Sequence, residues 1–109
     1  MIVATRILRL IGDDGDVDVP VSIHMPVEDD RCWRCDYEIG WPREPRSFRA
    51  LGVDGVQALQ LAMYAIGTDL WASRYHHAGR LVFEDSDPSY GFPAELPGEI
   101  GRNDVHRSE

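Results

Sequence analysis

The sequence predicts an α+β fold in which an antiparallel sheet of four to five strands carries one long helix on one face. Three observations support this two-layer arrangement. Residues 17–25 alternate between apolar and other side chains without a fault, as a half-buried strand does. Residues 55–73 repeat apolar side chains at helical spacing. Turn-forming stretches rich in Pro, Gly and acidic residues separate the strand-like segments.

The first two strands are expected to form a hairpin. Residues 2–11 are rich in β-branched side chains, and residues 12–16 (GDDGD) supply the turn before the alternating strand 17–25. Pro20 cannot donate a ladder hydrogen bond, so it favours an edge position or a bulge.

Three further strands are expected along the rest of the chain. Residues 26–30 (PVEDD) break the chain before a strand over 32–39. Residues 40–46 (GWPREPR) form a second break, after which 47–51 is a short fourth strand. Residues 80–84 (RLVFE) follow the helix and predict the last strand.

The helix has the strongest local signal in the chain. Asp54 is a good N-cap, and Gln57 three residues later completes a pair like a capping box. One apolar stripe is expected to face the sheet, and it consists of Val56, Leu59, Met63, Ile66 and Leu70. Small and apolar residues beside it predict burial over more than half the circumference, or a partner on the second side: Ala58, Leu61, Ala62 and Ala65.

The pair Cys32-x-x-Cys35 invites a metal or redox interpretation. On a strand, however, side chains alternate, so Cys35 shares the apolar face with Trp33 and Tyr37, while Cys32 lies on the polar face. A structural zinc site needs four ligands, and no second pair follows at a suitable spacing. We therefore expect a core Cys35, an incidental Cys32, no metal and no cofactor.

Composition and charge restrict the classes of partner. The chain has 109 residues, of which 43% are hydrophobic and 28% charged, as in a soluble globular domain. The 19 acidic residues outnumber the 11 basic ones, which gives a net charge of −8. This excess disfavours nucleic acid and anionic membranes and favours a basic protein partner.

The domain is expected to span residues 1–97, and the Pro-, Gly- and charge-rich residues 98–109 are expected to form a disordered tail. No uncharged apolar run approaches the ~20 residues needed to cross a bilayer. Arg6 and Arg9 interrupt the apolar start, so it lacks a clean signal-peptide core. The expected location is therefore cytoplasmic, with reduced thiols.

Acidic loops are the first candidate partner-binding residues. Two clusters stand out, Asp13, Asp14 and Asp16 in one loop and Glu28, Asp29 and Asp30 in another. Together with Glu84, Asp85 and Asp87 they suggest an acidic surface that binds a basic partner. The alternative is that each cluster is only a solvated turn.

A second stripe along the helix supplies the other candidates, namely Gln57, Gln60, Tyr64 and Trp71, with Gly67 between the last two. Amides and amphipathic aromatics beside a small residue suit a docking surface or a homodimer contact. The alternative is that they mark the boundary of helix packing, with Tyr64 and Trp71 beneath the segment 40–46.

Several stretches together resemble a known family. They are Trp33-x-Cys35-x-Tyr37-x-Ile39, the run GVDGVQALQLA at 52–62, and Gly91-Phe92-Pro93. The combination is similar to a group of small uncharacterised bacterial proteins known only as a domain of unknown function, over roughly residues 2–94. Gly55 stands where Ser is commoner in that pattern. The resemblance implies a bacterial cytoplasmic protein, and it implies no activity, cofactor or catalytic residue.

Two functional hypotheses follow. The first is a small acidic, non-enzymatic protein-interaction module, for example an immunity or antitoxin protein that blocks a basic toxin. The second is a small-molecule-binding or enzymatic domain with a pocket between sheet and helix, lined by Trp33, Tyr37 and Tyr64.

Overall fold

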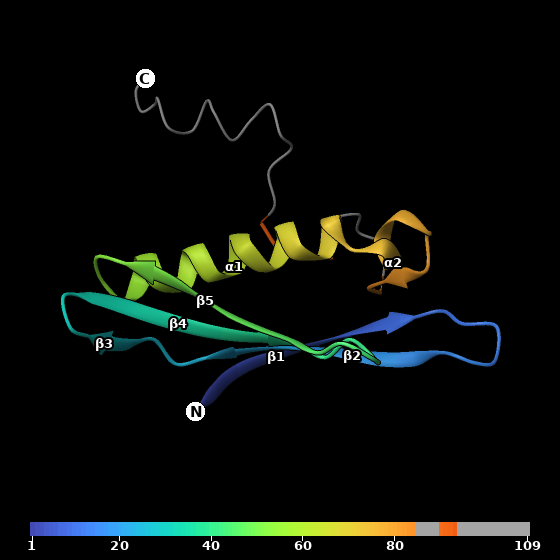
Figure 1. Ribbon diagram of the computed structural model, residues 1–109, viewed down its shortest axis with the longest axis horizontal. Helices are drawn as coiled ribbons and strands as arrows, with labels where there is room; N and C mark the ends of the chain where they lie inside the picture. The colour runs from blue at the N-terminus through green and yellow to red at the C-terminus, as the bar shows by residue number, and fades with distance from the viewer. Residues whose placement is uncertain (85–89, 94–109) are drawn as a thin grey trace, which may run out of the picture.

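One antiparallel sheet and one long helix packed on it make up the molecule in the computed structural model, which describes residues 1–84 and 90–93 (Figure 1). The described part contains six strands: β1 Ile2–Leu10, β2 Val17–His24, β3 Val27–Asp29, β4 Cys32–Ile39, β5 Arg46–Gly52 and β6 Leu81–Val82. Helix α1 (Gly55–Ala72) covers one sheet face, and the short α2 (Arg74–His77) follows it. The expected two-layer α+β fold is confirmed.

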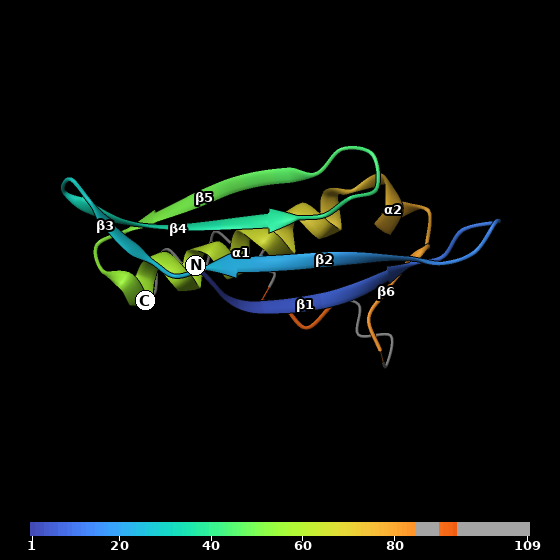
Figure 2. The ribbon, with the colours of Figure 1, turned by 90° about the horizontal axis from the view of Figure 1, so that it is seen from below.

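Strand β4 lies inside the sheet. It pairs with β5 on one side, and with β2 and then β3 on the other. Strand β1 pairs with β2 along its length, whereas β6 covers only Arg9 and Leu10 of β1 (Figure 2). Within residues 1–84 and 90–93, most of β1 therefore forms an edge of the sheet.

Strands β1 and β2 each end one residue before the expected position, and the boundaries of three further strands differ more. The expected break over 26–30 contains β3, which pairs with the start of β4. Three residues are too few for a period of two to be visible, and Asp30 turns the hairpin with a left-handed φ of 59°. Strand β5 extends over seven residues because β4 pairs with its whole length, while β6 has only two.

The N-terminus of α1 has the predicted cap. The side chain of Asp54 accepts a hydrogen bond from the Gln57 N–H at 2.8 Å, and Gln57 Oε1 accepts one from the Val53 N–H at 2.7 Å. At the other end, the Ser73 hydroxyl accepts from the His76 N–H at 3.1 Å, which starts α2. The helix therefore ends one residue before the expected Ser73.

The expected apolar stripe of α1 is only partly buried. Ile66 and Leu70 belong to the core, but Leu59 and Met63 are half-buried and Val56 is 76% exposed. The buried face runs instead through Ala58, Ala62, Ile66, Gly67 and Leu70. At Ala58 the helix approaches β5 closely, because a Cβ on Gly52 would lie 2.5 Å from the Ala58 backbone nitrogen.

The close approach to β5 places α1 off-centre on the sheet. The helix packs mainly on β4 and β5, so the β1 half of the covered face has less helix above it. On β4 the alternation is as expected, with Cys35, Tyr37 and Ile39 buried beneath the helix. Residues 94–97 of the expected domain and the expected tail 98–109 lie outside the described residues.

Candidate functional site

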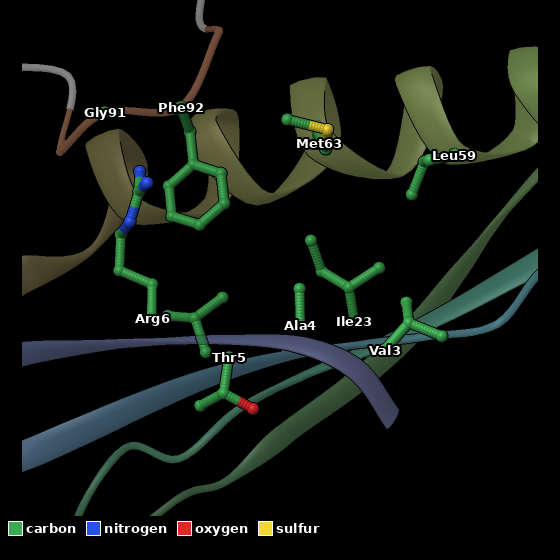
Figure 3. Close-up of a pocket in the computed structure, with 10 residues that line it drawn as sticks. Val3, Ala4, Thr5, Arg6, Ile23, Leu59, Met63, Gly91 and Phe92 are labelled. Carbon is green, nitrogen blue, oxygen red and sulfur yellow. The ribbon is translucent and has the colours of Figure 1, made fainter. Parts of the chain in front are cut away.

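An apolar cavity of about 270 Å³ lies between β1 and α1 (Figure 3). It exists because the helix is displaced toward β5, which leaves the half-buried side of α1 facing the edge of the sheet. Val3 is 48% exposed, so the cavity opens to solvent along β1. Its lining consists of Val3, Ala4, Thr5, Arg6, Val21, Ile23, Leu59, Met63, Gly91 and Phe92.

The backbone of β1 beside this cavity has an unpaired edge among the described residues. The Ile11 N–H donates to the Arg80 carbonyl at 2.8 Å, so Ile11 points its backbone groups toward β6. Because backbone direction alternates along a strand, Thr5 and Ile7 point theirs to the same side. From Leu8 back to the N-terminus, no described strand pairs with this outer side of β1. Such an edge is a template for another extended chain.

Among the described residues, Arg6 is the one charged side chain that lines the cavity. Its guanidinium donates to the Tyr90 carbonyl at 3.1 Å, and it lies 4.6 Å from the Phe83 ring centre and 5.0 Å from that of Phe92. No carboxylate among the described residues lies within ion-pair distance of it. Gly91 has a φ of 78°, and a Cβ there would overlap the guanidinium.

The segment 90–92 is anchored from the second helix. Tyr90 is buried, which raises the pKa of its hydroxyl, and this hydroxyl lies 2.5 Å from Nδ1 of His76. The His76 ring stacks on Trp71 with 4.8 Å between ring centres. These contacts hold Phe92 at the Arg6 end of the cavity, where Figure 3 shows its ring pointing toward the strand.

A second depression of about 240 Å³ lies largely on the uncovered sheet face and is mainly polar. Most of its charged side chains pair with one another: Arg34 reaches Asp36 at 3.0 Å, and His24 Nε2 lies 3.3 Å from Glu38. Arg49, opposite Asp36 on β5, makes no ion pair among the described residues. Arg34 also binds Asp29 at 3.1 Å. The apolar cavity beside the β1 edge is the stronger candidate site, because it combines an apolar lining and an arginine with backbone groups that no described strand pairs.

The two cysteines lie on opposite sheet faces, as the alternation predicts. Cys35 is buried beneath α1, and its thiol donates to the His24 carbonyl at 3.3 Å. Cys32 is half-buried, with its thiol 3.5 Å from the Asp29 carbonyl. Neither forms a disulfide.

The two acidic loop clusters lie at opposite ends of a molecule whose longest extent is 47 Å. In the β1–β2 turn, Asp16 pairs with Arg9 at 3.3 Å and Asp13 with Arg80 at 3.6 Å. In the β3–β4 hairpin, Asp29 pairs with Arg34. The clusters therefore do not form one continuous surface; Asp85 and Asp87 lie outside the described residues.

The second stripe of α1 does not form one exposed surface either. Gln57 and Gln60 are exposed, but the Gln57 side chain caps the helix. Tyr64 and Trp71 are half-buried, and Gly67 is in the core face. In the segment 40–46, Trp41 stacks on Tyr75 with 4.8 Å between ring centres.

The aromatic pocket expected between sheet and helix has other lining residues. Tyr37 is buried and hydrogen-bonds Asp69, and Trp33 packs against Gly55. Neither they nor Tyr64 line the apolar cavity. Arg6 was a usable signal for the cavity in the sequence. It lies two residues before Leu8 and four before Leu10, so it shares their buried sheet face and points inward.

No group of three or more His, Cys, Asp and Glu side chains within residues 1–84 and 90–93 could hold a metal ion. In the same part of the chain, no helix has both the length and the apolar character needed to span a bilayer.

Comparison with known proteins gives one match. A family model described as a domain of unknown function (DUF6968) matches residues 4–94, which include every described strand apart from the start of β1, and both helices. Neither a curated protein nor a solved structure matches the chain.

Proposed function

The chain belongs to the DUF6968 family of domains of unknown function, and we propose that it is a protein-interaction module that binds an extended segment of a partner along β1. In this proposal the domain acts by binding and not by catalysis. The partner segment adds a strand to the sheet edge, and one of its side chains enters the cavity beneath α1.

One observation carries the proposal: a strand edge that no described strand pairs with borders an apolar cavity. The edge around Thr5 and Ile7 offers backbone hydrogen bonds, which give affinity to any extended chain. The neighbouring cavity of about 270 Å³ offers a side-chain pocket, which gives selectivity. Exposed apolar side chains at Ile2, Val3 and Ile7 flank the same edge.

The acidity of the chain supports a basic partner, as for an immunity or antitoxin protein. The net charge is −8, and the acidic clusters lie at both ends of the long axis. In this version of the proposal they steer a basic protein toward the molecule, while β1 supplies the specific contact. Gel filtration tests this version: a basic toxin from the source organism should elute together with the chain.

The strand edge is tested with Thr5→Pro. The Thr5 N–H points away from β2, so proline there removes no ladder bond inside the sheet but blocks an added strand. Thr5→Val is the matched control, because it keeps the backbone N–H and the β propensity. A partner captured from the source organism by the wild type should be lost from Thr5→Pro and retained by Thr5→Val.

The same partner should also slow hydrogen exchange of the Thr5 and Ile7 amides. If Thr5→Pro, shown to be folded by circular dichroism, binds the captured partner as well as Thr5→Val does, the edge is not the binding site and the proposal is wrong.

The cavity also favours a second candidate function, the binding of a small carboxylic acid. Its volume of about 270 Å³ is below the ~300–1,000 Å³ typical of ligand pockets, so it suits a short chain. Hexanoate should then raise the melting temperature of the wild type and not of Arg6→Gln. No shift at millimolar hexanoate would remove this candidate.

We place the module in the bacterial cytoplasm. The family resemblance supports this location, as do the two cysteines, which lie on opposite sheet faces and form no disulfide. Fractionation of the source cell should recover the chain with cytoplasmic proteins.

A further inference from the structure

We propose that the partner segment carries an acidic side chain, followed two residues later by an apolar one, and that Arg6 binds the carboxylate. This inference rests on the proposed function and specifies its ligand. It follows from the order of side chains along β1 and from what surrounds each of them.

The apolar position lies opposite Ala4. Ala4 and Arg6 both face α1, and the small Ala4 side chain leaves the space between Ile23, Leu59 and Met63 open (Figure 3). An added strand places the side chain opposite Ala4 into this space. A Leu-sized side chain suits it, because the lining there is aliphatic or thioether.

The acidic position lies opposite Arg6. This guanidinium lies over the rings of Phe83 and Phe92, and its only described hydrogen-bond acceptor is the Tyr90 carbonyl. It therefore keeps donors for a carboxylate, which it would bind more strongly than a neutral group. The rings and Gly91 also fix its direction, so less side-chain entropy is lost on binding.

Strand geometry sets the order of the two positions. An antiparallel added strand continues the direction of β6 and passes Arg6 before Ala4. Side chains on one face recur every second residue, so the segment reads acidic, any residue, apolar. A second copy of this chain does not supply this pattern through β1, because Ile2–Leu10 contains no acidic residue. The partner as a whole can still be basic, because the proposal requires only one acidic side chain in the bound segment.

Three heptapeptides with acetylated and amidated ends test the inference. The first is Thr-Thr-Glu-Thr-Leu-Thr-Thr, the second has Gln in place of Glu, and the third exchanges the positions of Glu and Leu. NMR titration of the full chain should show the Thr5 and Ile7 amides responding. The Glu peptide should bind about tenfold more tightly than the Gln peptide, as expected for a hydrogen bond to a charged group, and more tightly than the exchanged peptide.

Arg6→Gln should abolish the preference for Glu over Gln while the Leu contact remains. Arg9→Gln is the matched control: it makes the same charge change on the same strand, but Arg9 lies on the uncovered face and pairs with Asp16. It should keep the preference. If Arg6→Gln loses its folded spectrum, Arg6→Lys takes its place, and a reduced preference is expected there.

The outcomes separate the two proposals. If none of the peptides shifts the Thr5 and Ile7 amides of the wild type, binding at this edge fails and the inference fails with it. If the peptides bind there but Glu and Gln bind equally, or Arg6→Gln keeps the preference, the interaction module stands and the assignment of Arg6 is wrong.

Discussion

At the scale of single residues, Asp69 joins the helix to the sheet. Its Oδ2 accepts a hydrogen bond from the Tyr37 hydroxyl at 2.6 Å and another from Arg46 Nε at 2.8 Å. Tyr37 is only 1% exposed, so its hydroxyl has no access to water as a replacement partner. An acidic residue near the end of α1 opposes the helix dipole, and these two donors offset that cost.

Removing either side chain of the Tyr37–Asp69 hydrogen bond should destabilise the fold, and the loss of Asp69 should cost more than the loss of the Tyr37 hydroxyl. Tyr37→Phe deletes the hydroxyl but leaves Asp69 bound to Arg46, and it should cost about 1.5 kcal/mol. Asp69→Ala leaves the buried hydroxyl without an acceptor, and it should cost about 2–3 kcal/mol. Urea unfolding measures both, with the exposed Asp14→Ala as a near-neutral control. A larger loss for Tyr37→Phe than for Asp69→Ala would contradict this assignment.

The same hydroxyl should make stability fall at alkaline pH. Burial, and then the hydrogen bond to Asp69, raise the pKa of Tyr37 above its ordinary value of 10.0. Below pH 10.0 the hydroxyl is protonated in both states, so its contribution is complete. Above it the unfolded chain releases the proton while the folded chain retains it, and stability falls as pH rises.

Urea midpoints for the wild type and Tyr37→Phe between pH 8 and 11 measure this contribution. The wild type should lose more stability than the variant above pH 10. Burial also raises the pKa of Cys35 and of Tyr90, but both remain in the variant and cancel from the difference. If the stability of the two proteins falls in parallel above pH 10, the ionisation of Tyr37 does not contribute to the loss.

At the scale of elements, α1 was predictable in extent but not in its buried face. Its start follows from the local signals of Asp54 and Gln57, and its end lies one residue before the expected Ser73. Which side is buried depends on where the helix lies on the sheet, and Gly52 of β5 sets that position by allowing the close approach. Periodicity ranked the larger Val56 above Ala58, because it measures apolar character and not the space available.

Two substitutions distinguish the observed buried face from the expected one. Ala62 is fully buried, so Ala62→Leu should overpack the contact with the sheet and cost about 1–3 kcal/mol. Val56 is largely exposed, so Val56→Ser should change stability by less than about 0.5 kcal/mol. Thermal or urea unfolding of the two variants gives the answer. If Val56→Ser is costly and Ala62→Leu is tolerated, the buried face of α1 is the expected one through Val56 and not the observed one through Ala62.

The candidate site was less predictable than the elements that form it. Strands β2 and β4 were visible as period-two patterns, and the faces of Cys32 and Cys35 followed from that period. The cavity depends on the offset of α1 and on the return of residues 90–92 to Arg6, some 84 positions along the chain. No local pattern encodes either, although the inward phase of Arg6 was an available sign.

At the scale of the whole molecule, the two layers cover the sheet unequally. Strand β4 has neighbours on both sides over residues 37–39 and lies beneath α1. At one margin β5 is covered by the helix on its inner face only, and at the other β1 has a neighbour on one side for most of its length. Local stability should therefore fall from β4 outward.

Hydrogen exchange of single amides tests this distribution and the open edge together. The Tyr37 and Ile39 amides of β4 should exchange most slowly. Within β1 the rates should alternate: Arg6 and Leu8 point toward β2 and should be protected, whereas Thr5 and Ile7 point outward and should exchange fast. If Thr5 and Ile7 are as protected as Arg6 and Leu8 in the free protein, the edge is already covered and is not a binding site. Protection that grows with protein concentration would identify a second copy as the cover, and protection independent of concentration would identify the chain itself.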